Sequence, residues 1–157
     1  MEIKYPEIIR KIRKIVRSIN LESKQIQKEY GVSIPQLLCL SFLNKQPKLY
    51  ASHKEIAGFL ELNSSTVTGI INRLENKSLV ARLPNTVDKR SINIAITSAG
   101  KKLMDEAPDL LHYRLMNRLR KLEQDDLLVI SNGLDLLIEH LGIGELEASP
   151  LLTIESE

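Results

Sequence analysis

The 157-residue chain contains no tryptophan, only six aromatic residues and a single cysteine, Cys39. One cysteine excludes an internal disulfide, which agrees with a reducing compartment. The longest uninterrupted apolar runs, LLCL at 37–40 and LLVI at 127–130, are far too short to cross a bilayer. The amino terminus carries no apolar signal segment. We therefore expect a cytoplasmic protein that has no contact with a membrane.

Patterns typical of enzymes are missing as well. The histidines lie far apart and form no ligand pair at helical spacing, and there is no nucleophile elbow, phosphate loop or zinc pattern. Cys39 lies in an apolar stretch, whereas reactive cysteines occupy exposed electropositive sites. We expect no catalytic residues, no metal site and no cofactor, and we interpret Cys39 as a core thiol rather than a peroxide sensor.

Acidic residues are scarce in the middle of the chain. Residues 64–102 carry seven lysines and arginines against two acids, a local charge of +5 that the overall +2 conceals. Residues 123–157, by contrast, carry nine acids and no lysine or arginine. A basic segment of this kind is typical of a surface that meets a polyanion. Its cations are Arg73, Lys77, Arg82, Lys89, Arg90, Lys101 and Lys102.

Apolar residues recur at helical spacing in six segments, and local signals mark where these helices begin and end. Pro108 predicts a kink or break near 104–108, because a proline removes one helical hydrogen bond and crowds the preceding turn. The first expected helix covers 6–29, and the second and third begin after the caps Ser33 and Ser52. The fourth covers 64–77 after the cap Asn63, the fifth about 98–121 after the cap Thr97, and the sixth 124–141. Further signals are capping boxes to Gln36 and Glu55 and the stops Gly31 and Gly142.

Two of the expected helices are joined by only three residues, ELN at 61–63, which makes them a helix-turn-helix candidate. Two short strands, 79–83 and 92–96, follow them, with the polar loop PNTVDKRS at 84–91 in between. A helix-turn-helix followed by a charged hairpin is the element order of a winged helix-turn-helix.

The chain resembles the MarR family of transcription regulators in two stretches, LNSSTVTGIINRLENKSLVAR and DKRSINIAITSAG. The resemblance implies a mainly α subunit over 1–157, a winged helix-turn-helix with a two-stranded wing and terminal dimerisation helices. The DNA-binding region would span 33–97, the helical dimerisation region 6–30 and 98–142, and a tail 143–157. Two positions depart from the family pattern, because Glu61 and Ser78 stand where the family has glycine. A left-handed backbone there would cost about 1–2 kcal/mol.

The outward face of the helix 64–77 is small and polar, which suits contacts to phosphates and base edges. In the loop we expect Asp88 to hydrogen-bond Arg90 and to hold its side chain outward, toward a minor groove whose negative potential attracts arginine. The alternative is an ordinary solvated pair. The candidate DNA-binding residues are Ser52, Ser64, Ser65, Thr66, Thr68, Gly69, Asn72, Arg73, Asp88, Lys89 and Arg90.

The apolar stripes of the first and last helices fit packing within one chain and also fit a dimer, which the family resemblance implies. The candidate interface residues are Ile8, Ile12, Ile15, Ile19, Leu134, Leu137 and Leu141. The basic face of the first helix fits a solvated surface better than a second DNA contact.

The sequence thus predicts a homodimeric transcription regulator that acts as a repressor and binds a pseudo-palindromic site in double-stranded DNA. Family members often respond to a small-molecule effector, but no residues of this chain can be assigned to one. The alternative is a winged-helix module that binds protein rather than DNA, for which the basic segment around the wing would have no use.

Overall fold

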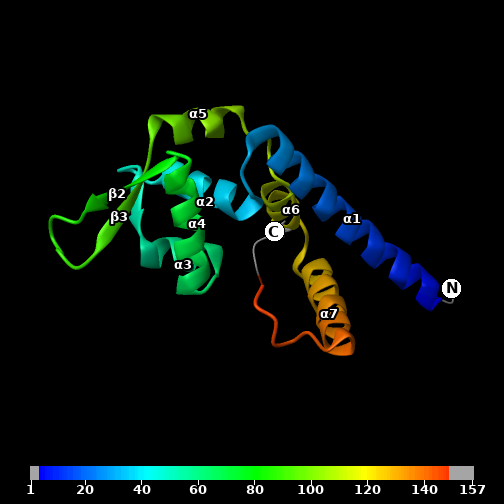
Figure 1. Ribbon diagram of the computed structural model, residues 1–157. Helices are drawn as coiled ribbons and strands as arrows, with labels where there is room; N and C mark the ends of the chain where they lie inside the picture. Colours follow the sequence, from blue (N-terminus) through cyan, green and yellow to red (C-terminus); the bar gives the residue numbers. More distant parts are fainter. Residues whose placement is uncertain (1–3, 149–157) are drawn as a thin grey trace. The chain divides into compact units, whose positions relative to one another are not determined.

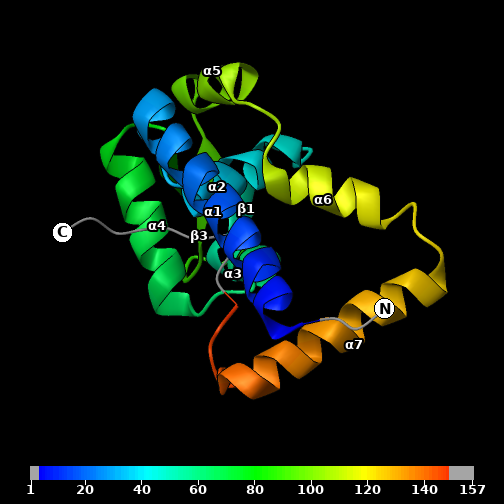
Figure 2. The same ribbon diagram turned by 90° about the vertical axis from the view of Figure 1, so that its right-hand side faces the viewer.

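The computed structural model describes residues 4–148, and the elements follow the predicted order (Figure 1). Contacts divide the chain into two compact units: residues up to Pro108 form the first, and Asp109–Ala148 form the second. The first unit contains α1 (Tyr5–Tyr30), α2 (Ile34–Lys45), β1 (Tyr50–Ser52), α3 (His53–Leu60), α4 (Ser64–Asn76), β2 (Val80–Pro84), β3 (Ile92–Ile96) and α5 (Ser98–Glu106). The second contains α6 (Leu111–Leu119) and α7 (Gln124–Leu141) (Figure 2).

The helix ends confirm the local signals in the sequence. Both capping boxes form: at α3 the Ser52 hydroxyl accepts a hydrogen bond from the backbone N–H of Glu55 (3.2 Å), and Glu55 accepts one from the backbone N–H of Ser52 (2.7 Å). The hydrogen bonds that the Glu55 carboxylate accepts from the backbone N–H and from the hydroxyl of Ser52 hold the pKa of Glu55 below its usual value. The stops Gly31 and Gly142 are left-handed, with φ of 67° and 66°.

The predicted break lies at Pro108. α5 ends at Glu106, and Ala107 takes the extended conformation, φ −70° and ψ 142°, that a following proline favours. The helix resumes only at Leu111, so the single segment expected over 98–121 is two helices, α5 and α6. The boundary between the two compact units falls at the same proline.

The sheet has one strand more than the two-stranded wing expected from the sequence. The hairpin β2–β3 is present as predicted, and β1 pairs antiparallel with the other edge of β3, which gives the order β1-β3-β2. Figure 1 shows the loop between β2 and β3 projecting beyond the strands. β1 is too short to show an alternating pattern, and it exists because β3 offers it an open edge.

The core of the first unit lies among α2, α3, α4 and the sheet. α2 is buried along most of its length, and Ile56, Val67 and Leu74 are fully buried beside it. Gly100 at the start of α5 is required by packing, because a Cβ there would lie 2.3 Å from the carbonyl oxygen of Leu79. The glycine that ends the stretch TSAG, residues 97–100, thus has a steric cause.

Within residues 4–148, three residues other than glycine have a left-handed backbone: Leu49, Glu61 and Ser78, with φ of 61°, 54° and 59°. Glu61 and Ser78 are the two positions at which the sequence departs from the family glycines. Ser78 ends the turn after α4, where its backbone N–H donates to the Glu75 carbonyl (2.8 Å) and its own carbonyl accepts from Thr97 Oγ1 (2.7 Å). The turn therefore keeps its geometry at the cost of backbone strain.

Ser78→Gly is expected to stabilise the protein. Glycine relieves a left-handed strain of about 1–2 kcal/mol, and the greater freedom of the unfolded chain takes back about 0.4–1 kcal/mol. A net gain on the order of 0.5–1 kcal/mol should appear in urea unfolding. Ser18→Gly, inside α1, is the matched control and should lose stability instead, because glycine is a poor helix former. Equal losses for both variants would contradict the strain at Ser78.

Candidate DNA-binding surface

α4 is amphipathic in the sense the sequence predicted. Val67, Ile70, Ile71 and Leu74 are buried, which turns the polar side of the helix outward. The predicted contact residues on this side are exposed, apart from a half-buried Gly69: Ser64, Ser65, Thr66, Thr68, Asn72 and Arg73. Asn63 caps the helix by accepting from the backbone N–H of Thr66 (2.8 Å). The positive end of the helix dipole lies at this capped N-terminus of α4.

Thr68 has a partner that sequence reasoning missed. Its hydroxyl donates to the carbonyl of Ser64 (2.9 Å), and His53 Nε2 lies 3.0 Å from the hydroxyl oxygen of Thr68, Oγ1. Because the only hydroxyl proton is used toward Ser64, His53 must be the donor, which fixes the Nε2–H tautomer. The hydroxyl of Thr68 is thus occupied within the helix-turn-helix, and its methyl group is the part left for a base edge.

Arg82, which the sequence analysis counts among the cations of the basic segment, is engaged within the chain. From β2 its guanidinium reaches α4, where Nη1 forms an ion pair with Glu75 and Nη2 donates to Asn72 Oδ1 (2.6 Å). Asn72 and Glu75 lie three residues apart, on neighbouring positions of the helix surface. No pattern within either segment reveals this link, because it joins residues that meet only when the hairpin packs on α4.

The wing tip is exposed, but Asp88 does not hold the Arg90 side chain as we expected. Asp88 Oδ1 accepts a hydrogen bond from the backbone N–H of Arg90 (2.9 Å). This bond to the residue two positions on forms an Asx turn. Asn85 closes the rest of the loop by accepting from the backbone N–H groups of Val87 and Asp88 (2.9 and 3.2 Å). Within residues 4–148 no ion pair joins the side chains of Asp88 and Arg90. Asp88 therefore shapes the loop, and the guanidinium of Arg90 remains open to solvent.

The other candidate phosphate contacts differ in availability. Lys89 lies exposed beside Arg90 at the wing tip, and Arg73 is exposed on α4. Ser52 is half-buried, and both its backbone N–H and its hydroxyl donate to Glu55 (2.7 and 2.8 Å). Ser52 itself therefore has no spare donor for a phosphate, although the positive end of the α3 dipole remains.

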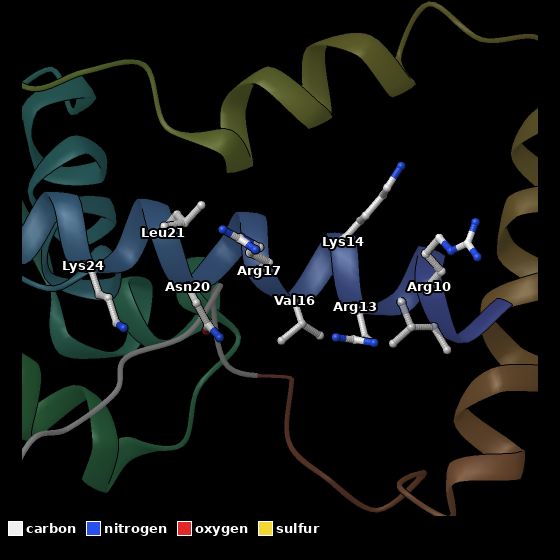
Figure 3. A pocket seen from close by; sticks show the side chains of 9 residues that line it. Arg10, Arg13, Lys14, Val16, Arg17, Asn20, Leu21 and Lys24 are labelled. Atoms are coloured by element: carbon white, nitrogen blue, oxygen red, sulfur yellow. The ribbon is translucent and has the colours of Figure 1, made fainter. Parts of the chain in front are cut away.

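One side of α1 is basic along much of its length. A hollow of about 720 Å³ lies along this helix, and its lining includes Arg10, Arg13, Arg17 and Lys24. Figure 3 shows these side chains projecting from the helix. Every lining residue belongs to α1, so no second element closes the hollow into a ligand site. Near the ends of α1, the Tyr30 hydroxyl donates to the Glu106 carbonyl (3.1 Å), and Tyr5 is 82% exposed.

The terminal helices expose their apolar faces in the single chain. No residue of α7 is buried, and only Ser23 and Ile26 are buried in α1. None of the seven predicted interface residues is buried; Ile15 is 57% exposed and Leu141 58%. Apolar surface of this extent marks an interaction site. None of the helices in the described part of the chain is long and apolar enough to span a membrane.

Among residues 4–148, no group of three or more His, Cys, Asp or Glu side chains could hold a metal ion.

Known relatives share the winged region. The MarR family model matches residues 32–92. The chain is 35% identical to the HTH-type transcriptional repressor MdtR of Bacillus subtilis over 95 residues, 60% of each protein. It is 29% identical to the organic hydroperoxide resistance transcriptional regulator of B. subtilis over 125 residues, 80% of this chain and 82% of that one.

Solved structures share the fold over more of the chain. MepR of S. aureus, in a complex with DNA, has a TM-score of 0.62 at 20% identity and covers 88% of this chain and 99% of its own. The YusO protein of B. subtilis has a TM-score of 0.54 at 29% identity, covering 85% of this chain and 94% of its own. The matches agree with the observed helix-turn-helix, wing and terminal helices. By the family model over residues 32–92 and by these relatives, the chain is similar to the helix-turn-helix transcription regulators of the MarR family.

Proposed function

We propose that the protein is a homodimeric repressor that binds a pseudo-palindromic operator in double-stranded DNA. Two features together carry the proposal: the polar face of α4 is exposed, and the guanidinium of Arg90 is open to solvent at the wing tip. Recognition helices of this kind read base edges in the major groove. The wing would then reach the flanking minor groove, where Arg90 meets enhanced negative potential.

The dimer is supported by the apolar faces of α1 and α7, which a single chain leaves in water. A second copy would cover them and would place two α4 helices on one face of the DNA. Two-fold symmetry then predicts half-sites about one helical turn, roughly 34 Å, apart. The relative MdtR is named as a repressor, and we assign the same direction of regulation here.

Selection of bound sequences from a random DNA pool tests the function, the symmetry and the spacing together. We expect an inverted repeat, with affinity that falls steeply as salt rises, because each neutralised phosphate releases counterions. Binding that is absent, or that does not depend on salt, would favour a protein-binding winged helix instead. A small-molecule effector remains a prediction, and we assign no residues to it.

Peroxide sensing, which the name of one relative suggests, is not proposed for this chain. Cys39 is fully buried in α2, and this burial raises the pKa of its thiol to about 12. At pH 7 the thiolate fraction is then about 10⁻⁵, and the thiolate is the reactive form.

We therefore expect the native protein to resist a neutral alkylating reagent that modifies the urea-unfolded chain completely. Mass spectrometry of both samples measures this. Treatment with an organic hydroperoxide should leave DNA affinity unchanged. Rapid alkylation of the native thiol, or release of DNA by the hydroperoxide, would show that Cys39 is a sensor after all.

A further inference from the structure

We propose that Arg82 is a positioning residue that turns the amide of Asn72 so that the amide presents hydrogen-bond donors to the major groove and selects guanine over adenine. This inference rests on the proposed DNA-binding function. It starts from the link between the wing and the recognition helix, in which Arg82 Nη2 lies 2.6 Å from Asn72 Oδ1.

The orientation of the Asn72 amide follows from the chemistry of its partner. The oxygen and nitrogen of an amide look alike in shape, but a guanidinium has only donors. The atom that faces Arg82 must therefore be the oxygen, and the NH₂ group must be on the other side. Asn72 is exposed, and Arg82 side-chain exposure is 32%, so the pair lies at the edge of the surface with the NH₂ group toward solvent.

The guanidinium is itself held in place. Arg82 lies on the same face of β2 as the buried Val80, opposite the buried Ile94 on β3. Strand alternation thus directs its side chain toward α4, where Glu75 takes the other side of the guanidinium. The planar guanidinium is thus held by its strand on one side and by Glu75 on the other, so it does not move together with the exposed Asn72.

The surface beside Asn72 is open. Gly69 lies one turn before it on the same side of α4, and a Cβ at Gly69 would meet nothing within 4 Å. Packing within the chain therefore does not require glycine there. Its effect is to leave the base-facing side of Asn72 uncrowded, so that the amide can approach a base edge closely.

The orientation has a consequence for base recognition. A free asparagine pairs with adenine by accepting from N6 and donating to N7. With Oδ1 turned toward Arg82, the adenine amino group lacks that acceptor. Guanine offers two acceptors, O6 and N7, in the major groove, and these match the donors that Asn72 presents.

The test uses the operator selected with the full-length wild-type protein, and the same site with each base pair exchanged in turn. We expect a guanine preference at one position of each half-site, worth about tenfold in affinity. Asn72→Ala and Arg82→Ala should each remove that preference. The double variant should lose no more than Asn72→Ala alone, because Arg82 acts through Asn72.

Two further variants separate positioning from folding. Arg82→Lys keeps the charge but lacks the planar fork, so it should fold normally by circular dichroism and still relax the guanine preference. Glu75→Gln removes the carboxylate charge that holds the guanidinium while leaving Arg82 and Asn72 present, so it should fold normally and weaken the preference in the same direction.

The inference is overturned if Arg82→Lys keeps the full preference, if the losses of Arg82→Ala and Asn72→Ala add, or if no half-site position that depends on Asn72 prefers guanine. A wild-type protein that selects no DNA sequence at all would instead overturn the proposed function.

Discussion

Arg90→Ala is expected to weaken operator binding by about 1–3 kcal/mol, the range of one good arginine contact. The fold and the dimer should persist, because the side chain is exposed at the wing tip and changes at such positions usually fall within about 0.5 kcal/mol. The loss should be largest on operators with A·T-rich flanks, whose narrow minor groove attracts arginine most strongly. Fluorescence anisotropy on a matched pair of A·T-rich and G·C-rich flanks measures both effects.

Lys89→Ala is the matched control, since it removes one charge from the neighbouring exposed position of the same loop. A phosphate contact carries no sequence information, so Lys89→Ala should weaken binding evenly across flanks and reduce the salt slope by about one. Unchanged affinity of Arg90→Ala on every flank would reduce the wing tip to an ordinary solvated turn.

Asp88→Ala should show a milder form of the Arg90 defect. Asp88 holds the backbone N–H of Arg90 at 2.9 Å rather than its guanidinium, so its loss loosens the loop without removing the charge. The order of defects, with Arg90→Ala larger than Asp88→Ala, follows from that geometry. The reverse order would mean that the carboxylate itself matters at the DNA.

Leu134→Glu is expected to convert the protein to a monomer. Leu134 is 49% exposed on the apolar stripe of α7, so a charge there does not disturb the core of a single chain. In a dimer the same carboxylate would be buried without a partner, which is strongly unfavourable. Loss of the second half-site contact should then lower operator affinity by about 10²- to 10⁴-fold. Sedimentation at micromolar concentration measures the assembly, and the anisotropy assay measures the affinity.

Asn132→Glu is the control for Leu134→Glu, because it adds the same charge on the opposite side of α7. This variant should remain dimeric. Deletion of residues 1–20, which removes most of the α1 stripe, should also abolish the dimer. A deletion variant that still sedimented as a dimer would place the interface on other elements.

Much of the fold was predictable because its signals are local. The caps at Ser33, Ser52 and Asn63, the glycine stops and the break at Pro108 each depend on atoms within a few residues of one another. The polar face of α4 was predictable for a similar reason, since helical periodicity alone separates it from the buried side. The wing followed from the order of these segments together with the DKR turn.

Contacts between segments distant in the sequence were decided only by the tertiary structure. β1 forms because β3 has an open edge, and His53 meets Thr68 only once α3 and α4 cross. Arg82, one of the cations of the basic segment, is the link between β2 and α4 because hairpin packing brings Glu75 and Asn72 within its reach. The chain by itself therefore determined which surfaces are polar, basic or apolar, because each depends on neighbouring residues. Which polar groups remain available to DNA was decided by folding, because a donor or acceptor is committed only when a partner from another segment arrives.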